Sequence, residues 1–347
     1  MKKRPVVITQ GDPAGVGPEI TLQAFSHRQE RETPWLWVGD PDLLSWVAEQ
    51  MQLPKPAIHR VKRSELQSSL TPNRLHVLPT EARIGLDQLQ FGQPRGENAH
   101  SVVESIRTAA DLAMRGLAGA VVTPPINKAV LHAGGYGWPG HTELLGEVTG
   151  VHEPVMMLAG RGLRVVPATI HQSIQSVPQS LNQAQLTRLF LVVEEAMRRD
   201  FGLRSPRIAI CGLNPHCGEG GAFGDEEGRI IAPAIAAAHQ ERGGEEFLFG
   251  PFPADSLFSE AARAPYDVII CMYHDQALIP IKMHAFGEAV NITLGLPIIR
   301  TSVDHGTAYD IAGQGRADYH SLLIALEQAS EMSANRQVWQ SSLEKSA

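Results

Sequence analysis

The sequence predicts an α/β fold with a mainly parallel sheet, divided into two lobes. Short apolar runs alternate with longer segments of helical periodicity along most of the chain, which is the pattern of repeated β-α-β units. The apolar runs are nearly continuous, as is typical of strands that are covered on both faces. With 347 residues, the chain also exceeds the size at which a single hydrophobic core usually keeps growing.

The expected strands are six apolar runs rich in β-branched residues. They are residues 5–9 (PVVIT), 35–39 (WLWVG), 120–123 (AVVT), 154–158 (PVMML), 207–211 (RIAIC) and 267–271 (DVIIC). Two helices are expected at residues 98–115 and 183–200, because apolar residues recur there every three or four positions. The stretch from Ala329 to Ala347 turns polar and predicts a loosely held tail.

Composition narrows the class of protein. The net charge of −7 argues against nucleic acid or an anionic membrane as a partner, although local cations could still bind a small anion. The apolar run behind the basic start covers only residues 6–8, which is too short for a secretory signal, and no run reaches a membrane span of about 20 residues. The three cysteines favour a reducing cytoplasm over a disulfide framework.

Three histidines each follow a strand-like apolar run. They are His171 in VVPATIHQS, His216 in IAICGLNPHCGEGG and His274 in DVIICMYHDQ. Ligands of open α/β sheets bind outside the carboxyl ends of the strands, and three imidazoles with an open position are a common catalytic metal site. The alternative is that each is a surface or satisfied core residue. Cys217 is a weaker candidate for a fourth ligand, since adjacent residues rarely point the same way.

Two glycine-containing segments are open to more than one interpretation. TQGDPAGVGPE (9–19) matches neither a dinucleotide fingerprint nor a P-loop, so its glycines either shape a strand-to-helix turn or allow close approach of a ligand. In PGHTELLGE (139–147), His141 and Thr142 stand at an expected helix start. Free N–H groups there favour an anion, but helix capping by Thr142 is the preferred interpretation from these residues alone.

A cationic and polar set lies near the end of the chain, at Lys282, Asn291 and Arg300. Arg300 precedes a glycine-punctuated polar loop at residues 301–315, and loops of this kind often carry function. Arginine is suited to bidentate recognition of carboxylate or phosphate. The alternative is a set of scattered, solvated charges.

Taken together, these motifs resemble the 4-hydroxythreonine-4-phosphate dehydrogenase family of pyridoxal phosphate biosynthesis. The resemblance covers about residues 5–330. Its motifs are TQGDPAGVGPE (9–19), PINK (125–128), GHTE (140–143), GLNPHCGEGG (212–221), FPADSLF (252–258), YHDQALIPIK (273–282) and VNITLGLPIIRTSVDHGTAYDIAG (290–313).

The resemblance implies a two-lobed isocitrate/isopropylmalate dehydrogenase-like fold, with mainly parallel sheets and an interdomain cleft. The implied lobes are residues 1–125 with 285–347 on the nucleotide side, and residues 126–284 on the metal and dimer side. It also implies a homodimer with shared active sites, in which each metal is completed by His274 of the partner subunit.

The resemblance further implies roles for individual residues. The implied metal ligands are His171, His216 and His274, the implied substrate-binding residues are His141, Thr142, Lys282, Asn291 and Arg300, and the implied residues for NAD or NADP are His305, Gly306, Thr307 and Ala308. Zinc best suits three imidazoles, and magnesium, cobalt and manganese are alternatives. No general base is assigned.

The implied reaction is oxidation of 4-phosphohydroxy-L-threonine at C3 with decarboxylation to 3-amino-2-oxopropyl phosphate, a step of pyridoxine 5'-phosphate biosynthesis. It requires NAD(P) and one divalent metal, and its only partners are a small phosphorylated amino acid and a second copy of the chain. The alternatives are a dehydrogenase of another four-carbon phosphorylated hydroxy acid, a metal-dependent hydrolase and a non-catalytic binding module.

Overall fold

A computed structural model describes residues 3–28, 33–53, 57–66 and 70–346. The chain divides into two compact units. Unit 1 comprises residues 1–154 and 296–338, and unit 2 comprises residues 155–295 and 339–347. Within the described residues, no helix combines the length and the apolar character that crossing a membrane requires.

Unit 1 is built on a sheet of strands in the order β3-β4-β2-β1-β5-β12, and each neighbouring pair is parallel. The strands are β1 (Val6–Thr9), β2 (Trp35–Gly39), β3 (Ile58–Arg60), β4 (Leu75–Pro79), β5 (Ala120–Thr123) and β12 (Arg300–Val303). Its helices are α1 (Gly17–His27), α2 (Pro41–Gln50), α3 (Ala99–Met114), α4 (Lys128–Ala133), α5 (His141–Thr149) and the start of α12 (His320–Ser346), with short 3₁₀ turns at η1 (Arg63–Glu65) and η2 (Gly96–Asn98).

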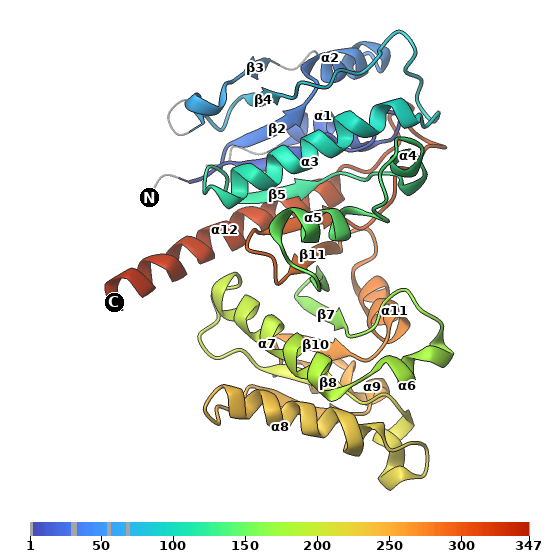
Figure 1. The fold of residues 1–347 in the computed structure, drawn as a ribbon, viewed down its shortest axis with the longest axis vertical. Coiled ribbons are helices and arrows are strands. Elements are labelled where there is room, and N and C mark those ends of the chain that lie inside the picture. The colour runs from blue at the N-terminus through green and yellow to red at the C-terminus, as the bar shows by residue number, and fades with distance from the viewer. Residues whose placement is uncertain (1–2, 29–32, 54–56, 67–69, 347) are drawn as a thin grey trace. The chain divides into compact units, whose positions relative to one another are not determined.

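Helix α3 covers the middle of this sheet and packs along β1, β2 and β5 (Figure 1). Its apolar side chains recur at helical spacing, and Val102 and Ile106 are almost completely buried. The helix ends before Gly116, whose φ of 69° is in the left-handed region that stops helices at glycine.

Unit 2 has strands in the order β11-β6-β7-β10-β8-β9. They are β6 (Val155–Gly160), β7 (Leu163–Pro167), β8 (Ile208–Cys211), β9 (Leu248–Phe252), β10 (Val268–Cys271) and β11 (Val290–Leu294). β7, β10, β8 and β9 are parallel, whereas β6 runs antiparallel to both β7 and β11. The helices are α6 (Val177–Ser180), α7 (Gln183–Arg199), α8 (Ala232–Glu241), α9 (Ala254–Leu257), α10 (Glu260–Arg263) and α11 (His274–Ala285). Three short turns complete the unit, at η3 (Ile174–Ser176), η4 (Pro215–Gly221) and η5 (Glu227–Ile231).

The structure confirms the predicted α/β class and the mainly parallel sheet. All six expected strands and both expected helices are present within about two residues of their predicted ends. The expected tail is wrong, because α12 continues to Ser346 and Ala329 and Met332 are 0% and 1% exposed. The alanine, glutamate, glutamine, methionine and leucine residues of this segment favour helix without making it apolar.

The boundaries between the units differ from the expected 125/126 and 284/285. Helices α4 and α5 belong to unit 1, because Val130, Leu131, Leu144 and Leu145 are buried in the same hydrophobic core as α3. The polar motifs of residues 125–143 therefore rest on the sheet that contains β1 and β5.

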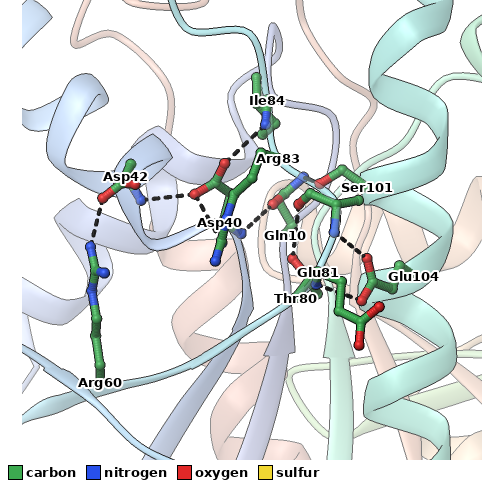
Figure 2. A network of polar contacts seen from close by, with 11 residues as sticks. Gln10, Asp40, Asp42, Arg60, Thr80, Glu81, Arg83, Ile84, Ser101 and Glu104 are labelled. Carbon is green, nitrogen blue, oxygen red and sulfur yellow. Dashed lines mark hydrogen bonds and ion pairs between the residues drawn. The ribbon is translucent and has the colours of Figure 1, made fainter.

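A buried polar network closes part of the carboxyl edge of the unit 1 sheet (Figure 2). Asp40, which follows β2, accepts hydrogen bonds from the backbone N–H groups of Asp42 (3.1 Å) and Ile84 (2.9 Å). The Gln10 amide, which follows β1, accepts from the Asp40 N–H at 2.8 Å and donates to Ser101 Oγ at 2.9 Å. These groups satisfy one another, so the network stabilises the strand ends rather than offering a ligand site.

Candidate functional site

Arg300 is a buried cation at the start of β12. Its side chain is 4% exposed, and its Nε and Nη2 donate to Thr123 Oγ1 at 3.0 and 2.7 Å. Burial lowers the pKa of Arg300 to about 10, while the nearby Glu143 carboxylate acts in the opposite direction. The guanidinium therefore stays charged at neutral pH, and Thr123 fixes its orientation.

Helix α5 starts beside this cation. The helix begins at His141, and its N-cap residue, Gly140, makes no side-chain cap. The expectation that Thr142 caps the helix is therefore wrong, since Thr142 already lies in the first turn. The first N–H groups of a helix lack intrahelical acceptors and favour an anion, so this helix start is available to a ligand.

His141 is electrically neutral in this position. Its Nε2 is buried and has no hydrogen-bond partner among the described residues. Burial, and next the positive charge of Arg300, hold the pKa of His141 well below its usual value. A neutral imidazole can donate or accept one hydrogen bond without adding charge.

The glycines of residues 9–19 serve backbone packing. A Cβ at Gly15 would lie 2.9 Å from the carbonyl oxygen of Thr307, and one at Gly11 would lie 2.9 Å from Pro124 Cβ. The Val16 N–H also donates to the Thr307 carbonyl at 3.0 Å. Of the two interpretations of this segment, the structure supports a turn that brings the loop after β1 against the loops after β5 and β12.

The expected nucleotide segment, residues 305–308, belongs to the loop after β12. His305 and Gly306 are exposed and Thr307 is buried, while Ala308 has a φ of 45° in the left-handed region. Farther along, the N–H of Gly313 donates to the buried Glu19 carboxylate at 2.8 Å. The loop is thus held to α1 and presents its first two residues to solvent.

Two of the three histidines that follow strand-like apolar runs lie close together in unit 2. His171 follows β7 and His274 begins α11 after β10, and β7 and β10 are neighbours in the sheet. Their ring centroids are 6.2 Å apart, and both line a pocket of 520 Å³. Asp275 Oδ1 lies 2.6 Å from His274 Nδ1, an arrangement that often orients a ligating histidine.

His216 does not complete a three-ligand cluster within one chain. In the part of the chain that the structure describes, no group of three or more His, Cys, Asp or Glu side chains could hold a metal ion. His216 lies in the loop after β8, whose residues 216–220 have φ values of 50°, 52°, 77°, 43° and 68°. Non-glycine residues pay about 1–2 kcal/mol each for this left-handed conformation, and such strain is concentrated at functional sites.

Glu227 supports the loop that contains His216. The sequence alone did not identify this residue. It is 6% exposed and accepts hydrogen bonds from the Asn214 backbone N–H at 2.8 Å and from Asn214 Nδ2 at 3.1 Å. The residue after His216, Cys217, packs on Gly212, where an added Cβ would lie 2.7 Å from Cys217 Sγ. Burial, and next the Glu227 charge, raise the pKa of Cys217, so its thiol remains protonated.

The remaining two expected substrate residues are also in unit 2. Lys282 is half-buried on the second half of α11. Asn291 is half-buried in β11, opposite Leu158 of β6.

Comparison with known proteins gives a consistent result. The family described as "Pyridoxal phosphate biosynthetic protein PdxA" matches residues 30–329. A 4-hydroxythreonine-4-phosphate dehydrogenase of Paracoccus denitrificans is 46% identical over 338 residues, covering 96% of this chain and 99% of that protein. The crystal structure of a 4-hydroxythreonine-4-phosphate dehydrogenase from Klebsiella pneumoniae superimposes with a TM-score of 0.87 at 37% identity, covering 95% of this chain and 98% of that one.

A more distant relative acts on a different substrate class. It is a terephthalate 1,2-cis-dihydrodiol dehydrogenase from Burkholderia xenovorans, with a TM-score of 0.68 and 27% identity, covering 94% of this chain and 98% of that one. The resemblance that the motifs suggested is confirmed by the family match and by the near-complete coverage of its relatives. The chain therefore belongs to the PdxA family of pyridoxal phosphate biosynthetic proteins.

Proposed function

We propose that the protein oxidises 4-phosphohydroxy-L-threonine at C3 with NAD or NADP, and that decarboxylation then gives 3-amino-2-oxopropyl phosphate, as a step of pyridoxine 5'-phosphate biosynthesis. The observation that carries this proposal is the buried Arg300 guanidinium beside the uncapped start of α5. A fixed cation together with free helix N–H groups suits a phosphate or carboxylate. The dehydrogenase relatives supply the reaction class.

In this proposal the chain binds and orients the substrate. Arg300 pairs with an anionic substrate group, and Thr142 in the first turn of α5 donates to the same group. Neutral His141 supplies one hydrogen bond from Nε2. Lys282 and Asn291 take the remaining substrate oxygens, as the family motifs imply. Residues 305–308 hold the nucleotide, which accepts the hydride from C3.

The donor chemistry of unit 2 fits a divalent cation. His171, His216 and His274 offer imidazole donors, and the Asp275 carboxylate beside His274 Nδ1 leaves Nε2 of that ring for a metal. We propose these three histidines as the ligands, with zinc best suited to imidazoles and magnesium, cobalt or manganese as alternatives. When bound, such a cation lowers the pKa of the substrate hydroxyl and stabilises the negative charge that develops on decarboxylation.

We further propose a homodimer in which His274 of the partner subunit completes each metal site. Helix α11, which begins at His274, carries an apolar stripe of Ile279, Met283 and the following Phe286, which are 58%, 84% and 82% exposed. Ile174, near His171, is 73% exposed. Exposed apolar residues mark interaction surfaces, and a second copy of the chain is the partner that would supply His274 to the His171 and His216 of this chain.

Subunit mixing tests the shared site. Inactive His171→Ala and His274→Ala proteins are mixed and allowed to exchange, so that each mixed dimer has one doubly defective site and one intact site. Random exchange makes about half of the dimers mixed, and activity should recover to roughly a quarter of wild type by the symmetry of a two-fold dimer. If mass spectrometry confirms exchange and no activity returns, the site is built within one chain.

Turnover tests the function itself. Purified protein with NAD or NADP, a divalent metal and 4-phosphohydroxythreonine should form NADH or NADPH, which absorbance detects. Unphosphorylated 4-hydroxythreonine should react far more slowly, because it lacks one of the two anionic groups that the substrate-binding residues are proposed to hold. Release of inorganic phosphate without reduced nucleotide would indicate a hydrolase, and binding without turnover would indicate a binding module.

A further inference from the structure

Unit 1 has a topological switch point between β1 and β5. In the strand order β3-β4-β2-β1-β5-β12, the chain moves from β1 to β2 on one side and later returns to β5 on the other. Ligands of open parallel sheets bind outside the carboxyl ends of the strands at such a point. The loops after β1 and β5 meet here, and the loop after β12 packs on them.

Asp12 joins these three loops. It is 1% exposed, and its backbone N–H donates to the Pro125 carbonyl in the loop after β5 at 2.9 Å. Its Oδ1 accepts from the Ala14 N–H at 2.9 Å, and its Oδ2 accepts from the Tyr309 hydroxyl in the loop after β12 at 2.7 Å. Both carboxylate oxygens are therefore used in holding backbone segments together.

The Tyr309 hydroxyl is the centre of this cluster. The side chains of Thr307 and Asn127 also lie close to it. Burial, and next the Asp12 charge, raise the pKa of Tyr309, so the phenol stays protonated and keeps donating. Thr307 belongs to the expected nucleotide segment and Asn127 belongs to the PINK motif. Neither motif by itself explains why the Asp12 carboxylate is buried.

We propose that the hydrogen bond between Tyr309 and Asp12 is a positioning element of the nucleotide site, which holds residues 305–308 in the conformation that binds a dinucleotide. The inference rests on the proposed function, because it presupposes that NAD(P) binds to this segment. A loop that is already ordered loses less conformational entropy when its ligand binds. Breaking the bond therefore weakens nucleotide binding and leaves substrate recognition at Arg300 unchanged.

The test is NADH affinity without substrate, measured by fluorescence titration of the full-length protein. Tyr309→Phe removes only the hydroxyl and should weaken NADH binding about 10- to 150-fold, the range for a lost hydrogen bond to a charged group. The KM for the phosphorylated substrate and the kcat at saturating nucleotide should stay close to wild type. Asp12→Asn should weaken NADH binding less than Tyr309→Phe does, because the amide can still form a hydrogen bond with the Tyr309 hydroxyl.

Tyr319→Phe is the matched control, since the Tyr319 hydroxyl forms no hydrogen bond with any other residue that the structure describes. This variant should bind NADH as wild type does. If Tyr309→Phe does not fold, the double variant Asp12→Val/Tyr309→Phe replaces it, because removing both partners costs less stability than removing one. Wild-type NADH affinity in either folded variant overturns the inference. If the wild-type protein itself does not bind NADH, the proposed function fails instead.

Discussion

Replacing Arg300 is the perturbation whose size the structure defines best. The side chain is 4% exposed, so solvent screens its contact with an anion very little. Loss of a hydrogen bond to a charged group costs about 1.5–3 kcal/mol, which is about 10- to 150-fold in kcat/KM. Arg300→Ala should show this loss in steady-state kinetics with the phosphorylated substrate, while the KM for nucleotide stays unchanged.

Arg300→Lys is the more informative variant. It keeps the charge but loses the planar fork, so it should be nearly as impaired as Arg300→Ala if the contact is bidentate. Thr123→Val keeps the guanidinium but removes the hydroxyl that orients it, and should give a smaller loss. Thermal unfolding of each variant controls for the fold. Wild-type kcat/KM in folded Arg300→Lys and Arg300→Ala would refute the anion-binding role.

Three further outcomes are expected. Replacing any one of the three proposed metal ligands with alanine should reduce bound metal and turnover strongly, and full metal occupancy by elemental analysis in all three variants would exclude the site. Met283→Asp, on the apolar stripe of α11, should shift dimer to monomer in sedimentation velocity, whereas Met114→Asp at a 50% exposed position should not. Burial and the Arg300 charge hold the pKa of His141 well below its usual value, so the imidazole is neutral between about pH 6.5 and 8. His141→Gln should therefore lower kcat/KM without changing the pH dependence of kcat/KM over that range.

The central strands and helices could be predicted because their signals are local. β1, β2, β5, β8 and β10 are continuous apolar runs, and α3 and α7 have apolar residues at helical spacing. β12 carries Arg300, Thr301 and Ser302, so only its pairing with β5 reveals it as a strand. The unit boundary was missed for a similar reason, since Leu144 and Leu145 of α5 are explained only by the core that they share with α3.

Some features of the candidate site could likewise be predicted from local sequence, and others could not. The positions of the histidines after strands were visible because each follows an apolar run. The uncapped start of α5 could not be predicted in this way. The sequence allows Thr142 to be the cap, but in the structure Gly140 is the N-cap residue and Thr142 lies in the first turn of the helix. Asp12 and Tyr309 are separated by 297 positions, and no local pattern pairs them. Glu227 likewise acts on a loop that precedes it by more than ten residues.

The reaction balance is the most direct test of the whole account. Substrate labelled at its carboxylate carbon is converted in a single incubation, and reduced nucleotide and labelled carbon dioxide are measured together. Oxidation at C3 followed by decarboxylation predicts equal molar amounts of both, and omission of the divalent metal by chelation should abolish both. Reduced nucleotide without carbon dioxide, or phosphate release without either, would contradict the proposed reaction.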